Sequence, residues 1–354
     1  MNLDELEMRK TKYFNSPDKD FIGGTLTKEF FRIDDDEIIG HEGENLRSDT
    51  KEIADSVLFR ELYESLMSGK SSYCTYLNGL FLNEQGKPLP KTDIYVPKYV
   101  SVLEKIVGTD KWLYAEVVGS RLANLMRIDT VYNLAPCFQG IRHGCFIDYK
   151  LYSVDYVPYG YETMTLYDMG FERYGYSAPL STFVENIRNN FASLATKYGL
   201  NPTQERMDNL INAFEEQYLF KRCMCGDTDF DVHNIAILFN PQNGDFRLSP
   251  LFDMEGLLGH SPHIEQRYLI RKSVEFVAEQ NSHMLQNFIV SANKLCRNKS
   301  LKNTMFAVGD DMFGAERRND WYQLVKENIN HMSKCYNSYM ADKEEKLSNQ
   351  VHSL

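Results

Sequence analysis

The chain has 354 residues, of which 43% are hydrophobic and 25% charged, as in an ordinary globular protein. Its formal net charge is −11. Binding to DNA or RNA depends on clustered Lys and Arg, so nucleic acid is not expected as the main partner. No signal-peptide h-region and no apolar run of membrane-spanning length occur, so no membrane association is expected.

The seven cysteines include no CxxC pair, which disfavours a zinc site. They are expected to be reduced thiols, as in a cytoplasmic protein. Export into a host cell without a signal peptide is an open alternative.

The first 100 residues are predicted to contain one helix between two stretches of strands, turns and irregular structure. The polar stretch 1–50, punctuated by glycines, predicts irregular structure or short strands. A helix with one apolar face is expected over 49–67. Residues 68–100 alternate strand and turn signals and end in a predicted strand over 94–100.

The next stretch predicts one helix followed by three short strands. The helix covers 109–126, with Asp110 as its candidate cap. The strands are expected at 131–138, 144–149 and 151–157.

Beyond residue 179 the apolar spacing becomes helical. Helices are expected around 183–198 and 207–219, and again over 261–350. Between them, strands over 235–239 and 246–251 predict a hairpin.

The order of these elements predicts an α+β fold with two lobes. Residues 1–67 are expected to form an N-terminal extension and residues 68–158 a strand-rich N-lobe. Residues 159–354 are expected to form a helical C-lobe that contains the hairpin.

The densest polar cluster is the segment 226–234, Gly-Asp-Thr-Asp-Phe-Asp-Val-His-Asn. Its three Asp residues would repel one another without a cation, and magnesium prefers oxygen ligands. A hairpin places its outer ends side by side, so Asn234 and Asp253 are expected to lie close together. Two metal ligands beside an Asp base are what kinase-type phosphoryl transfer requires.

An Asp-rich segment such as 226–234 has two other possible interpretations, a helix cap or turn and an EF-hand loop. Such loops are often only helix caps or turns, but a further Asp at the far end of the hairpin favours a metal site. An EF-hand loop starting at Asp227 would need Gly at its sixth position and Glu at its twelfth. Val232 and Leu238 stand there, which excludes an EF-hand.

These motifs resemble those of the HipA-like serine/threonine kinases. The catalytic loop of that family reads roughly G-N-T-D-x-H-x-x-N, and a later strand ends in S/A-P-x-Y-D. This chain has Gly226-Asp-Thr-Asp229 with Asn234 five residues on, and then Ser249-Pro-Leu-Phe-Asp253. The resemblance implies a two-lobed kinase that uses ATP and magnesium and is able to autophosphorylate. It also implies that Asp229 is the catalytic base and that Asn234 and Asp253 bind magnesium.

The chain departs from the family pattern at three positions. Asp227 replaces the family's Asn, and Phe252 replaces Tyr. Asp231 stands where the family often has His. His233 is therefore expected to be a hydrogen-bonding loop residue rather than a participant in the chemistry.

A kinase also needs a strand Lys that binds the α- and β-phosphates and a helical acid that orients it. Lys98 is the candidate, with Lys87 and Lys91 as rivals. Glu116 is the candidate acid, because the helix around it is similar to the family's N-E-x-x-x-x-x-L-A-x-x-L-G-I helix.

The segment Ser153–Val157, followed by Pro158, looks like the hinge strand of the family. The backbone of Asp155, Tyr156 and Val157 is expected to pair with the adenine edge. An ordinary core strand is the alternative.

A phosphate-covering loop is expected at 68–72, where backbone N–H groups of Ser71 and Ser72 would contact the phosphates. It is not a P-loop, because Glu64 stands where that motif requires Gly.

The sequence thus favours a kinase that transfers the γ-phosphoryl group of ATP to Ser or Thr of an unidentified protein. A catalytically silent nucleotide-binding or protein-interaction module on the same fold is the alternative. A metal-dependent phosphohydrolase would need two metals and several carboxylates. The sequence has no second His/Asp cluster to supply them.

Overall fold

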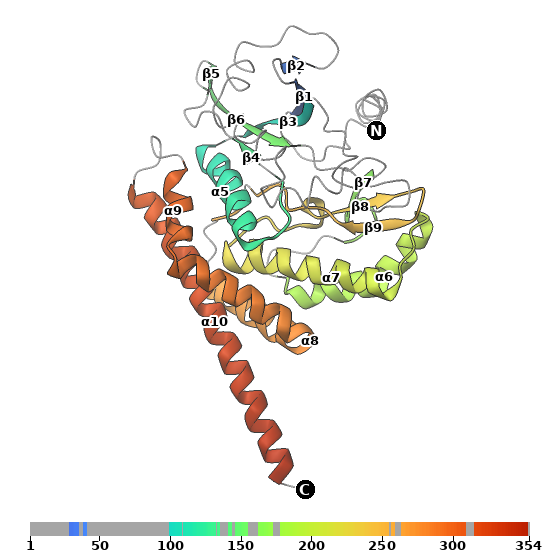
Figure 1. Ribbon diagram of the computed structural model, residues 1–354, viewed down its shortest axis with the longest axis vertical. Helices are drawn as coiled ribbons and strands as arrows, with labels where there is room; N and C mark the ends of the chain where they lie inside the picture. The colour runs from blue at the N-terminus through green and yellow to red at the C-terminus, as the bar shows by residue number, and fades with distance from the viewer. Residues whose placement is uncertain are drawn as a thin grey trace, which may run out of the picture.

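A computed structural model describes about two thirds of the chain, and within this part the fold is α+β. The described residues are 28–34, 38–40, 99–107, 109–131, 133–134, 141–143, 146–154, 162–172, 178–254, 256–258, 263–308 and 315–352. Figure 1 shows a six-stranded sheet at one end of the molecule and most of the helices at the other. The helix predicted over 49–67 and the lobe boundary near 158 lie outside the described residues.

The six-stranded sheet is antiparallel in every pairing between its strands, in the order β2-β1-β3-β6-β4, with β5 paired to β6. Its strands are β1 (Lys28–Asp34), β2 (Ile38–Gly40), β3 (Tyr99–Val107), β4 (Asn133–Leu134), β5 (Ile141–His143) and β6 (Phe146–Val154). The first two strands come from the predicted N-terminal extension and join β3 in one sheet. Two separate strands were expected where β6 runs unbroken, because Lys150 pairs through its backbone with Ile106 and keeps the ladder continuous.

Helix α5 (Asp110–Met126) confirms the helix predicted over 109–126. Its N-cap is Thr109, whose side chain accepts a hydrogen bond from the N–H of Trp112, so the expectation that Asp110 caps it is wrong. The capping residue lies just outside the helix, whereas Asp110 lies in its first turn. There its negative charge interacts favourably with the positive end of the helix dipole. Figure 1 shows α5 between the six-stranded sheet and the helices below it.

The three-stranded sheet carries the predicted hairpin. It has the order β7-β8-β9, with strands β7 (Glu162–Thr165), β8 (Ala236–Asn240) and β9 (Asp245–Leu248). Strand β9 is shorter than predicted because Leu251, the next residue that could bond to β8, pairs with Asp129 and Val131 instead. The hairpin itself is therefore confirmed, with its second strand ending before Ser249.

The helices that follow β7 cover this sheet. They are α6 (Leu180–Lys197) and α7 (Gln204–Tyr218), which continues into the π-helix η3 (Leu219–Met224). Phe183, Phe214, Tyr218 and Phe230 pack their rings together, with centroids 5.0–6.5 Å apart. Because Phe230 belongs to the polar segment 226–234, this aromatic cluster fixes that segment on the helices.

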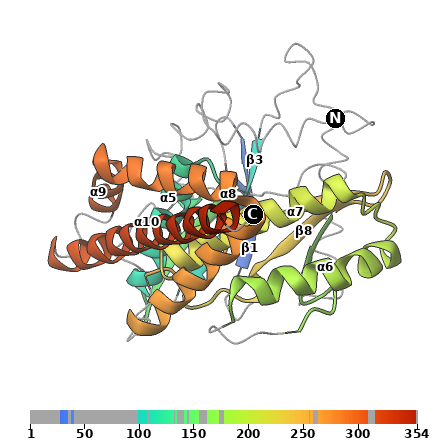
Figure 2. The ribbon, with the colours of Figure 1, turned by 90° about the horizontal axis from the view of Figure 1, so that it is seen from below.

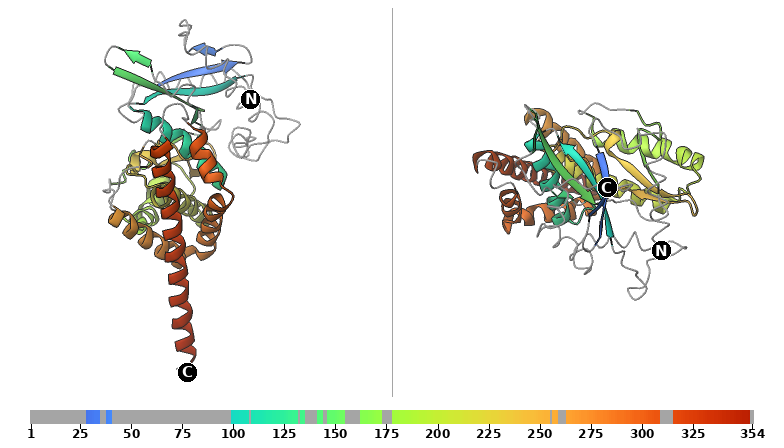
Figure 3. Two further views of the ribbon diagram at one scale, coloured as in Figure 1. Left: turned by 90° about the vertical axis from the view of Figure 1, so that its left-hand side faces the viewer. Right: turned by 90° about the horizontal axis from the view of Figure 1, so that it is seen from above.

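The C-terminal part is helical, as predicted: α8 (His263–Arg297), α9 (Ser300–Ala307) and α10 (Ala315–His352). Asn281 has non-helical backbone angles and interrupts α8. Helix α10 crosses the other helices, and its last turns extend away from them (Figures 1 to 3). None of the described helices has a stretch apolar enough to span a bilayer. Four cysteines fall in the described part and are free thiols, of which Cys223 and Cys225 are buried.

Glu215 on α7 is expected to make stability depend on pH. Its side chain is buried, and burial raises the pKa of this carboxyl group from 4.5 to about 7. The folded protein therefore holds the proton more tightly than the unfolded chain, so stability falls as pH rises from 4.5 to about 7. The loss amounts to about 3 kcal/mol at about 1.4 kcal/mol per pKa unit.

The variant Glu215→Gln should remove most of this decline. Urea unfolding at pH 5 and pH 8 measures it. The exposed Glu279 supplies the control variant Glu279→Gln, which should keep the decline of the unmodified protein. An equal decline in Glu215→Gln would contradict the assignment.

Candidate active site

The polar segment 226–234 follows the π-helix η3, and buried polar side chains from distant helices hold the end of that helix. Gln266 on α8 donates to the carbonyl of Arg222 at 2.6 Å. Asn328 on α10 donates to the carbonyl of Met224 at 3.1 Å. Gly226 then has a φ of +67°, a left-handed conformation that glycine adopts without steric cost. The chain therefore leaves η3 in a fixed direction.

A buried lysine of η3 forms an ion pair with the segment 226–234 and hydrogen bonds with the segment that follows β9. Lys221 Nζ lies 3.3 Å from Asp227 Oδ2, and the two side chains are 1% and 0% exposed. The same Nζ donates to the carbonyls of Phe252 at 3.3 Å and Asp253 at 3.0 Å. Asp227 Oδ1 in turn accepts a hydrogen bond from the N–H of Asp229 at 2.8 Å. One lysine thus positions the backbone at both ends of the hairpin.

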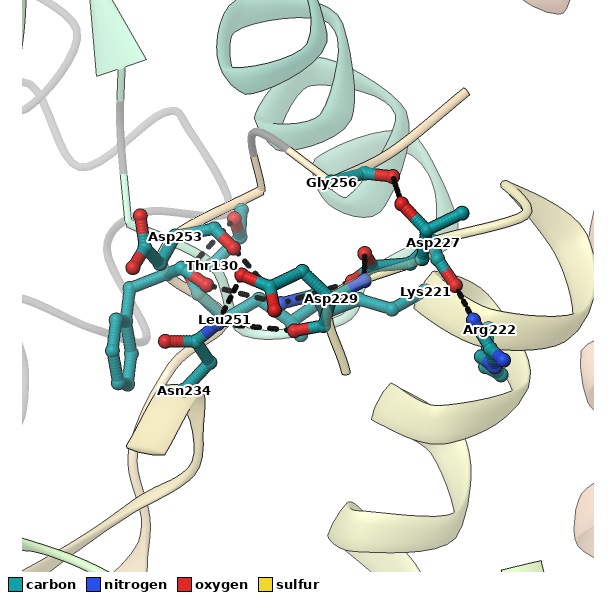
Figure 4. A network of polar contacts seen from close by, with 11 residues as sticks. Thr130, Lys221, Arg222, Asp227, Asp229, Asn234, Leu251, Asp253 and Gly256 are labelled. Atoms are coloured by element: carbon teal, nitrogen blue, oxygen red, sulfur yellow. Dashed lines mark hydrogen bonds and ion pairs between the residues drawn. The ribbon is translucent and has the colours of Figure 1, made fainter. Parts of the chain in front are cut away.

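Asp229, Asn234 and Asp253 come together at the open side of this network (Figure 4). Asn234 Nδ2 donates to the carbonyl of Asp229 at 3.0 Å and to its Oδ2 at 3.2 Å. Asn234 belongs to the short 3₁₀-helix η4 (Val232–Asn234) that leads into β8. The hairpin geometry expected from the sequence is therefore present.

The pKa of Asp229 is raised above that of an ordinary aspartate. Partial desolvation of the carboxyl group is the largest cause, followed by the negative charges of Asp227 and Asp253. Lys221 and the hydrogen bond from Asn234 oppose the rise. The residue as a whole is exposed, so its carboxylate combines access to solvent with a strongly negative environment.

Backbone pairing with the segment that follows α5 positions Asp253. Leu251 donates to the carbonyl of Asp129 and accepts from the N–H of Val131, both at 2.8 Å. Gln217 on α7 donates to the carbonyl of Ser249 at 2.7 Å. Asp253 itself has a φ of +52°, a region that few residues other than glycine adopt.

Two glycines allow the segment after Asp253 to approach its neighbours closely. A Cβ atom at Gly256 would lie 2.8 Å from Asp229 Cβ and 2.9 Å from Asp229 N. A Cβ atom at Gly119 on α5 would lie 2.9 Å from Met254 Sδ. All three distances are shorter than real Cβ contacts. At Gly256 the neighbours include the backbone of Asp229, so a side chain does not fit there, whereas at Gly119 the Met254 side chain would have to shift. Sequence reasoning missed both, since neither glycine belongs to a turn or motif signal.

His233 is a hydrogen-bonding loop residue, as predicted. Its backbone N–H donates to Asp231 Oδ1 at 3.1 Å, and its Nδ1 lies 2.7 Å from the same oxygen. Its ring also stacks on Tyr167, with centroids 4.0 Å apart. Asp231 thereby fixes the imidazole.

The other predicted site residues are placed as follows. Glu116 is buried in α5, with 1% of its surface exposed. Its pairing with a lysine stays a prediction. The remaining candidates lie outside the described residues: Lys98, Ser71, Ser72, Asp155, Tyr156 and Val157. Lys221 is the residue that sequence reasoning missed, although a charge inside an apolar helix was a signal for it.

In the described part of the chain, no three His, Cys, Asp or Glu side chains converge as a metal site. Magnesium in phosphoryl-transfer sites is usually held by one or two carboxylates together with nucleotide phosphates and water. The Asp253 carboxylate and the amide oxygen of Asn234 fit that pattern. The repulsion that Asp229 experiences from Asp253 also fits a place for a cation.

No protein-family model matches the chain, and no curated protein matches it. Among solved structures, it is similar to the crystal structure of a Helicobacter pylori proinflammatory kinase, CtkA. The identity is 10%, the TM-score is 0.46, and the match covers 71% of this chain and 94% of that chain.

The chain is also similar to a Shewanella oneidensis structure of the toxin–antitoxin system HipA and HipB with its operator DNA. The identity is 11%, the TM-score is 0.34, and the match covers 69% of this chain and 62% of that chain. A HipA-containing structure is thus among those to which the chain is similar. Both TM-scores lie below 0.5, so the function proposed below rests on the geometry of the site.

The Lys221–Asp227 pair yields a stability prediction. Replacing Lys221 by Met leaves the Asp227 carboxylate buried without its cation, which should cost about 3–5 kcal/mol of unfolding free energy. The double variant Lys221→Met/Asp227→Asn should recover part of that loss, because no buried charge remains. Urea unfolding of both single variants and of the double variant measures the coupling. Additive losses would show that the two charges do not interact.

Proposed function

We propose that the chain is an ATP-dependent, HipA-like serine/threonine protein kinase. The observation that carries this proposal is the arrangement of Asp229, held by Asn234 and adjacent to Asp253. An exposed Asp beside one amide and one further carboxylate matches the base and metal ligands of kinase-type phosphoryl transfer.

In this proposal Asp229 accepts the proton of the acceptor hydroxyl. Its raised pKa makes it a better base than an ordinary aspartate, and its exposure gives the acceptor access. The hydrogen bond from Asn234 holds its carboxylate in one orientation. Asn234 and Asp253 would bind magnesium, which supplies charge neutralisation at the phosphates when it is bound.

ATP is proposed to bind between two lobes. The six-stranded sheet would form the N-lobe, and the helices with the three-stranded sheet would form the C-lobe. The stretch between β6, ending at Val154, and β7, beginning at Glu162, joins the two sheets and contains the proposed hinge Asp155–Val157. Lys98 directly precedes β3 in the sequence, and Glu116 lies on the helix that follows β3.

The remaining roles complete the proposal. Lys98, oriented by Glu116, would bind the α- and β-phosphates, and the backbone of Ser71 and Ser72 would cover them. The acceptor would be a Ser or Thr of another protein, or of this chain in autophosphorylation.

The variant Asp229→Asn should lower phosphate transfer by about 10²- to 10⁴-fold, because the general base is lost. Its unfolding free energy should not fall, since the raised pKa means that the charged carboxylate is disfavoured in the fold. Labelling from γ-labelled ATP and urea unfolding measure the two effects.

The matched control is Asp245→Asn. Asp245 pairs with Arg206 at 3.2 Å, at the turn end of the same hairpin. This variant should label like the unmodified protein. Undiminished labelling in Asp229→Asn would overturn the proposed base, and ATP binding without any labelling would favour the silent module.

Magnesium is expected to bind mainly together with ATP, because the chain offers few protein ligands for it. Calorimetry should show weak binding of magnesium alone and tight binding of ATP with magnesium. Asp253→Asn should weaken the magnesium-dependent binding of ATP by roughly tenfold or more. The control Asp208→Asn, at an exposed position of α7, should not. Equal affinity with and without magnesium would contradict this ligand assignment.

A further inference from the structure

An exposed aromatic side chain lies against the proposed catalytic loop. Tyr167 is the second residue after β7, and 49% of its surface is exposed. Its ring stacks on His233 with centroids 4.0 Å apart and an interplanar angle of 27°. Its backbone N–H donates to the carbonyl of Val232 at 3.3 Å, and Leu166 donates to Ile235 at 2.9 Å. The turn that carries the ring is therefore fixed on the loop.

The same contacts fix the ring relative to the proposed base. Asp231 holds both the backbone and the imidazole of His233. The next residue is Asn234, whose amide is hydrogen-bonded to Asp229. Tyr167 and His233 thus form a preorganised aromatic platform beside the base, and the network around Asp229 does not use them.

The two segments that carry this platform are acidic in sequence. Glu162, Asp168 and Glu172 are exposed on the segment that carries Tyr167. The ranges 162–172 and 226–234 contain no Lys or Arg. Asp168 follows Tyr167 directly, and Asp231 holds His233. An exposed aromatic ring close to carboxylates matches the chemistry of arginine, whose planar guanidinium stacks on rings and pairs with carboxylates.

We infer that the aromatic platform of Tyr167 and His233 binds an arginine-containing segment of the acceptor protein and places the acceptor hydroxyl near Asp229. This inference rests on the proposed kinase function and adds a basic acceptor segment as its substrate class. A nucleotide base is the competing occupant, since bases also stack on aromatic rings. The carboxylates on the two segments that carry the platform favour a cationic ligand over one that carries phosphates.

The test measures binding alone, so it does not depend on catalysis. Fluorescence anisotropy follows a labelled short peptide with one Ser flanked by Arg, and the same peptide with each Arg replaced by Glu. The full chain should bind the Arg peptide and not the Glu peptide. Tyr167→Ala should weaken binding of the Arg peptide by about fivefold or more, whereas Tyr167→Phe should retain it because the ring remains.

The matched control is Tyr268→Ala. Tyr268 on α8 is similarly exposed, at 53%, and makes no part of the platform. This variant should bind the Arg peptide like the unmodified chain. A parallel titration with a fluorescent ATP analogue should give the same affinity in all of these variants.

Three outcomes would overturn the inference: no binding of the Arg peptide, equal binding of the Glu peptide, or unchanged affinity in Tyr167→Ala. Weakened binding of the ATP analogue alone in Tyr167→Ala would assign the ring to the nucleotide and would also overturn it. Labelling from γ-labelled ATP decides the kinase proposal separately, because it needs no peptide.

Discussion

The candidate site depends on the buried ion pair between Lys221 and Asp227. Two charges removed from water are tolerated only when they are paired and hydrogen-bonded. The network meets this requirement, because Lys221 also donates to two carbonyls after β9 and Asp227 accepts from the backbone of Asp229. Displacing either partner would therefore disturb both ends of the hairpin at once. Lys221 and Asp227 thereby hold the segments that carry Asp229 and Asp253 next to each other.

Electrostatic repulsion is the second constraint on the site. Asp227 and Asp253 both raise the pKa of Asp229, and Asp253 adopts a backbone conformation that is unfavourable for most residues. Bringing these groups together lowers the stability of the fold, and such local costs are typical of functional sites. The proposed catalytic role gives a reason, since a bound cation would balance the negative charges of these carboxylates. The buried ion pair supplies the rigidity that keeps the repelling groups in place.

Close backbone approach links the site to α5. Gly256 leaves no side chain between the segment after β9 and Asp229, and Gly119 lets the same segment pack against α5. At the other end of α5, Tyr114 donates to the carbonyl of Met305 at 2.6 Å and stacks on Trp321. The helix that carries Glu116 is therefore held between the segment after β9 and the C-terminal helices. A shift of that segment would be transmitted to α5.

The sequence by itself determined the features that depend on near neighbours in the chain. Helical spacing predicted α5, α6 and α7 and the helical character of 261–350, though not its division into α8, α9 and α10. The predicted hairpin brought Asn234 and Asp253 together because antiparallel strands return to their starting point. Lys221, Gly119 and the stacking of Tyr167 on His233 could not be predicted in this way. The hydrogen bonds from Lys221 to the carbonyls after β9, the close approach at Gly119 and the Tyr167 stacking each join segments about 30 to 140 residues apart, which meet only in the folded protein. Tertiary structure decided these contacts because long-range packing leaves no periodic signal in the sequence.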